Sequence, residues 1–237
     1  MAITQKNILG VLGGMGPVAS AEFLRTIYDY DMGEREQLAP IVFLYSDPSF
    51  PDRTDAFIAG DDDVILKMLV DALGRLRKLG ASRIVICCMT IHYLLPKLRP
   101  ALRGRIVSML DVIFANIPQS EQKHLLICSS GSRRLKLFEN HEKWEASSRS
   151  FLLPEDADQD RIHRSLIYPI KRSPDIGGLF PFLVAMLEKY EVDSFIVGCS
   201  EVHLLAKRFL SDQRYKDRYG CIDPFAIIAN QIRQDRR

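Results

Sequence analysis

The chain has 237 residues, of which 47% are hydrophobic, so it can bury a substantial core as one large domain or two small ones. Its 32 basic and 30 acidic residues leave a formal net charge of +2, which gives no electrostatic case for binding nucleic acid or an anionic membrane surface. No apolar run approaches the ~20 residues that span a bilayer, and the N-terminal residues lack a signal-peptide profile, so a cytoplasmic protein is expected.

The N-terminal part of the chain predicts a strand, a glycine turn and a helix. Residues 7–12, which are apolar from Ile8 onward, predict a buried strand, and residues 19–30 carry the inward stripe of a helix. Between them, the turn Gly13-Gly14-Met15-Gly16-Pro17 exposes backbone N–H groups at a helix N-terminus, which is a natural anion cradle. The glycine spacing is not Gly-x-Gly-x-x-Gly and no Lys-Ser/Thr follows, so a nucleotide site is disfavoured.

The next strand is predicted at residues 41–45 and leads into a proline-rich loop, residues 46–54. Ligands bind at the C-terminal ends of the strands in parallel sheets, so Arg53 in this loop is a candidate carboxylate fork. The alternative is an ordinary surface pair between Arg53 and an aspartate. After a long amphipathic helix at 61–79, a third apolar strand runs directly into Cys87 and Cys88.

The order of elements then repeats. A short helix after His92, interrupted by Pro96 and finished by Pro100, precedes the second occurrence of an apolar strand and a small-residue turn, which begins at Ser129. Two correspondences in the same order predict two similar α/β halves. The remaining predicted elements are a strand at 105–108, a helix at 110–117, strands at 123–128 and 151–153, a helical stripe at 162–170, a helix at 179–190, a strand at 194–198 with a helix to residue 210, a strand at 220–222 and a last helix from residue 224.

Cys88 and Cys199 occupy equivalent positions of the two halves, because each follows an apolar strand and has a histidine four residues later. Five cysteines without a Cys-x-x-Cys spacing predict free thiols rather than disulfides or a zinc site. A thiolate between a strand and a helix is stabilised by backbone N–H groups and the helix dipole. This favours Cys88 and Cys199 as reactive thiols over Cys87, Cys128 and Cys221, although a buried structural role is the commoner fate of a single cysteine.

Five motifs in this order resemble those of the aspartate/glutamate racemase superfamily, and within it the aspartate racemase branch. They are the turn at 13–17, the loop at 46–54, Cys88-Met89-Thr90-Ile91-His92, Ile167-Tyr168-Pro169-Ile170-Lys171 and Gly198-Cys199-Ser200-Glu201. The resemblance implies two similar three-layer α/β domains with mainly parallel sheets, residues 1–109 with 216–237 and residues 110–215, and an active site in the cleft between them. It also implies racemisation without a cofactor, and frequently a homodimer.

The expected substrate is a small amino acid, most simply a dicarboxylic one such as aspartate or glutamate. Racemisation needs a base on one face of Cα and an acid on the other, and two opposed thiols can exchange these roles. A pyridoxal Schiff base on Lys171 is then unnecessary, and no metal is expected. Besides the catalytic Cys88 and Cys199, the expected substrate-binding residues are Met15, Gly16, Arg53, Met89, Thr90, Ser129, Ser130, Lys171, Ser200 and Glu201.

Several of these residues have a structural alternative. Lys171 and Glu201 suit the ends of helices, and Thr90 and Ser200 suit helix caps. His92 and His203 lie one turn after the cysteines, where packing or surface roles are favoured over thiol activation.

Met89 stands where the family has an asparagine, and a thioether has no N–H to donate to a carboxylate. This favours altered specificity before loss of activity. The alternatives left open are a hydantoin-type racemase or related isomerase on the same scaffold, and a ligand-binding or regulatory homologue.

Overall fold

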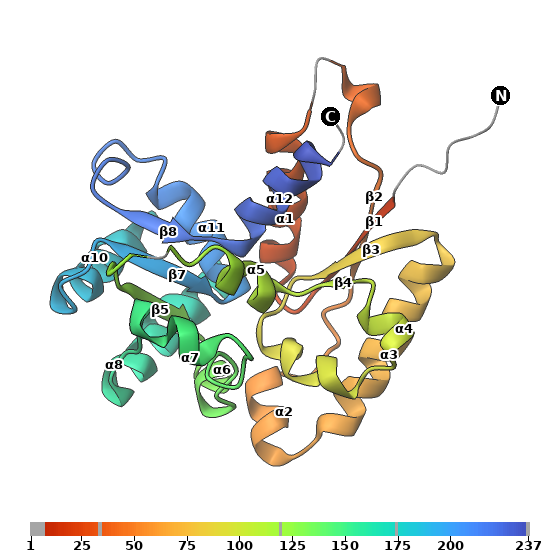
Figure 1. Ribbon diagram of the computed structural model, residues 1–237, viewed down its shortest axis with the longest axis horizontal. Coiled ribbons are helices and arrows are strands. Elements are labelled where there is room, and N and C mark those ends of the chain that lie inside the picture. The colour runs from red at the N-terminus through yellow and green to blue at the C-terminus, as the bar shows by residue number, and fades with distance from the viewer. Residues whose placement is uncertain (1–7, 33–34, 119, 174, 236–237) are drawn as a thin grey trace.

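The computed structural model describes residues 8–32, 35–118, 120–173 and 175–235, which form two α/β halves (Figure 1). The strands of the first half are β1 (Ile8–Gly13), β2 (Val42–Ser46), β3 (Ala81–Ile86) and β4 (Ile106–Val107), and those of the second are β5 (His124–Cys128), β6 (Phe151–Leu152), β7 (Ser194–Gly198) and β8 (Gly220–Ile222). Each set makes a four-stranded parallel sheet, with orders β2-β1-β3-β4 and β6-β5-β7-β8. The two orders are the same, which confirms the predicted pair of similar parallel α/β domains.

Helices flank both sheets. Those of the first half are α1 (Pro17–Tyr30), α2 (Arg53–Ala59), α3 (Asp62–Lys78), α4 (Pro100–Arg103) and α5 (Met109–Ala115), with 3-10 segments η1 (Glu36–Leu38) and η2 (Thr90–Lys97). The rest of the chain forms α6 (Ser130–Arg134), α7 (Trp144–Ser147), α8 (Asp156–Arg161), α9 (Tyr168–Arg172), α10 (Phe180–Lys189), α11 (Ser200–Phe209) and α12 (Pro224–Gln234), with 3-10 segments η3 (Ser148–Ser150) and η5 (Gly177–Leu179) and the π-helical η4 (Ile162–Ile167).

The apolar pattern of the sequence explains how these elements pack. In α3, Ile65, Leu69 and Leu73 are fully buried on one face, while acidic residues open the helix and basic residues close it, as its dipole favours. One apolar cluster covers this side of the first sheet and another fills the second half. A third cluster contains Phe23 of the first half and Leu126 of the second, so the two halves share a core.

The last elements of the chain correct part of the predicted domain division. β8 pairs in parallel with β7, so residues 220–222 belong to the second sheet and not to the first domain. α12, in contrast, packs on α1 and α5, and the rings of Phe23 and Phe225 lie 4.8 Å apart. The chain's end therefore returns to the first half only from α12 onward, and the remaining domain boundaries stay predictions.

The segment after Cys88 also differs from the prediction. Its helix begins at Thr90, before His92, and is a 3-10 helix that contains Pro96. Pro100 does not finish a helix but begins α4, where its fixed φ suits the first helical position and its missing N–H is not needed.

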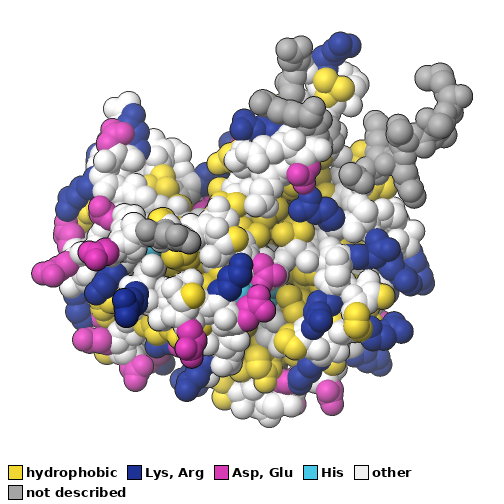
Figure 2. All heavy atoms as spheres, in the orientation of Figure 1, with side chains coloured by type: hydrophobic (Ala, Val, Ile, Leu, Met, Phe, Trp, Pro, Cys, Tyr) yellow, Lys and Arg dark blue, Asp and Glu magenta, His cyan; other side chains and the backbone are white. Residues whose placement is uncertain are grey.

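The distribution of surface charge and the lengths of the helices concern the predicted absence of nucleic-acid and membrane partners. On the face in Figure 2, basic and acidic side chains are interspersed over both halves. Within the described residues, no helix combines the length and the apolar character needed to cross a membrane.

Candidate active site

The segments that follow β1, β2 and β3 of the first sheet meet those that follow β5, β6 and β7 of the second. Thr90 Oγ1 lies 3.1 Å from Ser129 Oγ, and Lys171 Nζ lies 3.7 Å from Asp52 Oδ2. The carboxylate of Glu201 lies against Gly16, because a Cβ on this glycine would overlap Glu201 Oε1. Two pseudo-equivalent strand ends and the loops beside them thus form a single site between the halves.

Cys88 and Cys199 both lie in this site and are 5% and 6% exposed. Burial raises the pKa of Cys199 well above its usual value, and the charges of Glu201 and Cys88 act in the same direction while Lys171 opposes them. The two thiols are therefore close enough to influence each other. Cys87 has other surroundings, since it packs in the apolar cluster shared by the halves, where burial raises its pKa too. The alternation of an extended segment places the adjacent cysteines in different apolar clusters.

Glu201 is the polar partner of Cys199. The Cys199 thiol donates to Glu201 Oε2 at 2.9 Å, and Ser200 Oγ donates to the same oxygen at 3.3 Å. Glu201 is 2% exposed, and its Oε1 has no hydrogen-bond partner among the described residues. A buried carboxylate oxygen without a donor is costly, so Oε1 is an acceptor available to a ligand.

Arg53 is anchored mainly by backbone carbonyls. Its Nη1 donates to the carbonyls of Phe50 and Pro51, and its Nη2 donates to that of Met15 at 2.9 Å. Nε is buried and has no partner among the described residues. Burial opposes the charge of Arg53, but the charges of Cys88, Asp52 and Glu201 outweigh it and raise the pKa of Arg53. The guanidinium is thus held next to Cys88 with one buried donor uncommitted.

Lys171 is the second cation of the site. Its ammonium lies over the ring of Tyr168, 5.0 Å from the centroid, and is paired with Asp52. Burial alone would lower the pKa of Lys171, but the charges of Glu201, Cys199 and Asp52 raise it. Lys171 therefore interacts both with the carboxylate of Asp52 and with the charges of Glu201 and Cys199.

Three hydroxyl groups join the two halves beside the cysteines. Thr90 Oγ1 lies 3.1 Å from Ser129 Oγ and 3.0 Å from Ser132 Oγ, and the two serine oxygens are 3.1 Å apart. Three hydroxyl protons can satisfy all three contacts. Thr90 and Ser129, predicted to bind substrate, thus already have protein partners. Ser130 Oγ is buried without a partner among the described residues.

The remaining residues that were predicted to bind substrate make contacts within the protein. The Gly14 N–H donates to Ser20 Oγ at 3.3 Å, so the glycine turn satisfies part of its own cradle. Met15 and Met89 are 2% and 1% exposed and pack in apolar clusters, although the Met15 carbonyl receives Arg53. Their roles toward substrate stay predictions.

The two histidines make structural contacts and do not touch the thiols. His92 Nε2 accepts the Met109 N–H, so Nδ1 carries the proton that is donated to the Cys88 carbonyl at 3.0 Å. Burial lowers the pKa of His92 to about 4, which agrees with a neutral ring. His203 Nδ1 lies 2.6 Å from Asp223 Oδ2, and its Nε2 lies 2.8 Å from Thr26 Oγ1.

Sequence reasoning missed three residues of the site, namely Asp52, Ser132 and His163. Asp52 was visible as the neighbour of Arg53 in the proline-rich loop. Ser132 lies in the turn that was recognised, but nothing in the sequence shows that it meets Thr90. His163 lies in a π-helix, whose geometry moves side chains away from the faces that a 3.6-residue period predicts.

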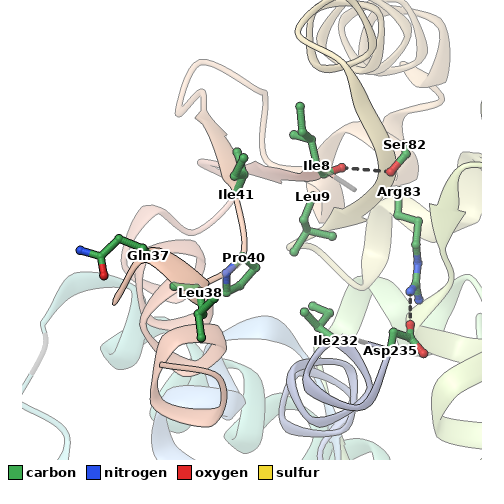
Figure 3. A pocket seen from close by; sticks show the side chains of 11 residues that line it. Ile8, Leu9, Gln37, Leu38, Pro40, Ile41, Ser82, Arg83, Ile232 and Asp235 are labelled. Carbon is green, nitrogen blue, oxygen red and sulfur yellow. Dashed lines mark hydrogen bonds and ion pairs between the residues drawn. The ribbon is translucent and has the colours of Figure 1, made fainter. Parts of the chain in front are cut away.

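A separate cavity of about 300 Å³ lies at the other end of the first sheet (Figure 3). Its lining includes Ile8 and Leu9 at the start of β1 and Ile232 near the end of α12, with the Arg83–Asp235 ion pair at 2.7 Å beside them. Ligands of parallel sheets bind at the C-terminal strand ends, which are on the cysteine side. Within the described residues, no group of three or more His, Cys, Asp or Glu side chains is arranged to hold a metal ion.

Comparisons with known proteins agree with the predicted relationship. The sequence matches the Asp/Glu/Hydantoin racemase family over residues 12–232. It is 27% identical over 221 residues to the broad specificity amino-acid racemase RacX of Bacillus subtilis (strain 168). This alignment covers 91% of this chain and 94% of the relative.

Solved structures show the same fold. Picrophilus torridus aspartate racemase aligns with a TM-score of 0.80 at 19% identity over 97% of this chain and 94% of that chain. Glutamate racemase from Campylobacter jejuni subsp. jejuni aligns with a TM-score of 0.61 at 17% identity over 96% of this chain and 85% of that chain.

The family match takes in both sheets and both cysteine segments, so it concerns the whole site rather than one half. The predicted enzyme class, a racemase and therefore an isomerase, is confirmed by the family match. The chain belongs to the Asp/Glu/Hydantoin racemase family.

Proposed function

We propose that this chain racemises an amino acid without a cofactor, and that Cys88 and Cys199 are the opposed acid and base. The observation that carries the proposal is the placement of two buried thiols, from equivalent positions of the two halves, in one site between them. Each has a different charged neighbour, because Cys199 donates to Glu201 whereas Cys88 lies beside Arg53.

The arrangement supports a two-base mechanism. A thiolate on one face of Cα removes the α-proton, and the electron pair is delocalised into the adjacent carboxylate. The thiol on the other face then delivers its proton to Cα, which inverts the centre and exchanges the protonation states of the cysteines. For the opposite enantiomer the two thiols exchange roles.

The charged residues support binding of an amino-acid zwitterion. Arg53 Nε is a buried donor suited to a carboxylate, and Glu201 Oε1 is a buried acceptor suited to an ammonium group. The fixed cations also stabilise the negative charge that develops when the α-proton leaves. We propose a substrate range that includes aspartate and glutamate, and the broad specificity of the Bacillus relative supports testing neutral amino acids too.

Exchange of the substrate α-hydrogen in deuterated water tests this function. The wild-type protein should incorporate deuterium and invert at least one member of a panel of acidic and neutral amino acids. Cys88→Ser and Cys199→Ser should each lower racemisation by about 10²- to 10⁴-fold, the usual contribution of an acid or base. Cys221→Ser is the matched control, since Cys221 lies in β8 and outside the site.

Two results would contradict the proposal. Exchange that persists in the double cysteine variant would exclude the thiols as the acid and base. Calorimetric binding of an amino acid by the wild-type protein without any exchange would identify a binding protein on this scaffold.

A further inference from the structure

The helix that begins at Cys199 packs on a helix of the other half. Cys199 is the N-cap of α11, and Glu201, which accepts from the Cys199 thiol, lies in the first turn of α11. α11 packs on α1 of the first half (Figure 1), and Glu201 lies against Gly16, the N-cap of α1. The way α11 lies on α1 therefore helps to set where Cys199 is held relative to the half that contains Cys88.

Two buried side chains connect these helices. Thr26 of α1 and His203 of α11 are each 1% exposed, and Thr26 Oγ1 lies 2.8 Å from His203 Nε2. The other ring nitrogen of His203, Nδ1, lies 2.6 Å from Asp223 Oδ2. Asp223 is itself fixed, because it is the N-cap of α12 and its Oδ1 accepts the Phe225 N–H. The imidazole is thus held on both sides and offers Thr26 a partner at one definite place.

Lys207 adds a second contact one turn further along α11. Its ammonium donates to Glu22 Oε1 at 2.7 Å, to Thr26 Oγ1 at 3.1 Å and to Asp29 Oδ2 at 2.6 Å. Glu22, Thr26 and Asp29 are spaced by four and three residues, so they form one stripe along α1. Within this stripe, Thr26 is the residue that meets both His203 and Lys207.

Directional bonds suit a contact that must fix position. Hydrophobic burial is non-directional, so apolar packing alone does not hold two helices at one register. A hydrogen bond weakens steeply when its geometry is distorted, so the Thr26–His203 contact favours one register of α11 on α1. Thr26 does not act on substrate directly, because it is 1% exposed and its Oγ1 already contacts three protein groups.

We propose that Thr26 is a positioning residue for racemisation. Through His203 it holds α11 in the register on α1 at which Cys199 faces the half that holds Cys88. This inference rests on the proposed racemase function and extends it to a residue outside the site. Loss of the Thr26 hydroxyl lets α11 shift on α1, which moves Cys199 relative to Cα of the substrate and leaves Cys88 in place.

A shift of Cys199 alone affects the two enantiomers differently. The enantiomer whose α-proton is removed by Cys199 should lose both exchange and inversion. For the other enantiomer, Cys88 still removes the α-proton, exchanges it with deuterated water and returns a deuteron to the same face of Cα. Exchange then survives while inversion, which needs a proton from Cys199, is lost. A protein that is only less stable loses every rate in the same proportion, because only its folded fraction falls.

Thr26→Val removes the hydroxyl at nearly constant volume and tests the inference. Inversion should fall by at least about tenfold, since a misplacement of about 1 Å can cost ~10²-fold in rate. For one enantiomer and not the other, the ratio of exchange to inversion should rise by at least about threefold over the wild type. Thr26→Ser keeps the hydroxyl and should keep the wild-type ratio.

Two variants of His203 identify which of its bonds matters. The amide of a glutamine reaches as far as Nε2 and can still meet Thr26, whereas the amide of an asparagine reaches only as far as Nδ1 and meets Asp223. His203→Asn should therefore raise the ratio of exchange to inversion as Thr26→Val does, and His203→Gln should raise it less.

Ser194→Ala is the matched control. It also removes a buried hydroxyl that contacts a histidine, since Ser194 Oγ lies 2.7 Å from His124 Nδ1. Ser194 begins β7, at the opposite end of this strand from Cys199. This variant should keep the wild-type ratio of exchange to inversion for both enantiomers.

Alkylation by iodoacetamide gives a readout that does not depend on turnover. Cys128 is fully buried in β5, so its alkylation reports larger unfolding of the protein. In Thr26→Val, the alkylation rate of Cys199 should rise by at least about threefold relative to that of Cys128, because a shifted α11 exposes its own N-cap.

Two results would overturn the inference and leave the racemase proposal standing. These are an unchanged ratio of exchange to inversion in Thr26→Val, and an unchanged ratio of Cys199 to Cys128 alkylation. A wild-type protein without exchange or inversion would instead overturn the proposed function, while alkylation of Cys199 in Thr26→Val would still decide whether Thr26 positions this thiol.

Discussion

Cys88 and Cys199 are equivalent in sequence but have neighbours of opposite charge. Cys199 donates to a carboxylate and so retains its proton in the resting site. Cys88 lies beside the guanidinium of Arg53. The single residues Glu201 and Arg53 thus give the two equivalent cysteines different electrostatic surroundings.

Glu201 should control the ionisation of Cys199. After burial, the negative charge of Glu201 is the largest cause that raises the pKa of Cys199. Glu201→Gln removes this charge, so the pKa of Cys199 should fall. In the direction of racemisation in which Cys199 is the acid, the alkaline limb of the kcat/KM profile should then move to lower pH.

The profile should be measured for both enantiomers of one substrate. Glu188→Gln is the control, because Glu188 lies in α10, before β7, and forms an exposed ion pair with Arg218. An alkaline limb at the same pH in Glu201→Gln and the wild type would show that Cys199 is not the titrating acid.

Elements differ in how far the sequence predicts them. The strands before both cysteines and the helix α3 were predictable, because each is a local pattern of buried residues. The pairing of β8 with β7 was not, since no local pattern states which sheet a three-residue strand joins. The turn after Cys88 is a 3-10 helix and not an α-helix, so the helix-dipole argument applies fully only to Cys199 at the start of α11.

The site was predictable where a residue type and a motif coincide, and not where the contact is long-range. Arg53 and Lys171 are cations in recognisable segments, and both lie in the site. Ser132 meets Thr90 across 42 residues, and His163 reaches Ser130 across 33, so only the folded chain reveals these contacts.

His92 and His203 hold equivalent elements together. His92 connects the segment after Cys88 to the first residue of α5, and His203 connects α11 to Asp223, which caps α12. α5 follows β4, the last strand of the first sheet, and α12 follows β8, the last strand of the second. Each of these helices is thus attached by a histidine to the segment that follows the cysteine of the same sheet. This accounts for the four-residue spacing of cysteine and histidine without a role in proton transfer.

His92 should make the protein less stable in weak acid. Its pKa is lowered to about 4 in the folded state by burial, against 6.5 as its ordinary value. The unfolded chain therefore binds the proton more readily, and stability is lost as the pH falls from about 6.5 to about 4. By linkage this contribution is about 2 kcal/mol between pH 7 and pH 5.

Urea unfolding at pH 7 and pH 5 measures this effect. In His92→Gln the drop between the two pH values should be smaller than in the wild type by about 2 kcal/mol. His141→Gln serves as the control for a histidine outside this network. Equal drops in the wild type and His92→Gln would show that His92 is not the group that takes up the proton.

The whole molecule has two kinds of contact between its halves. On one side, α11 packs on α1 through the His203–Thr26 hydrogen bond and the 2.7 Å ion pair between Lys207 and Glu22. On the other side, the Thr90–Ser129 hydrogen bond and the Lys171–Asp52 pair join the halves near the cysteines. Cys88 and Cys199 are 5% and 6% exposed, so the contacts on this second side leave the thiols largely covered.

Gly131 sets how closely the halves approach. A Cβ at this position would lie 2.5 Å from Thr54 Oγ1 and 3.0 Å from Thr54 Cα, so α6 and α2 meet in a contact that only glycine permits. Thr54 Oγ1 can rotate away but its Cα cannot, and Gly131→Ala should therefore hold the halves apart. The two cysteines proposed to react come from different halves, and a misplacement of about 1 Å can cost ~10²-fold in rate.

Gly131→Ala should lower kcat/KM by at least about tenfold, while the free energy of unfolding should fall by no more than about 1 kcal/mol, since alanine is favoured over glycine in a helix and neither sheet is disturbed. Steady-state racemisation and urea unfolding measure the two quantities. Thr54→Ala removes one of the overlapping atoms and should recover part of the activity in the double variant. Gly74→Ala, with no atom within 4 Å of the added Cβ, is the control for the glycine change itself. Full activity in Gly131→Ala would contradict this argument. It would show that the reaction does not depend on how closely the two halves bring the cysteines together.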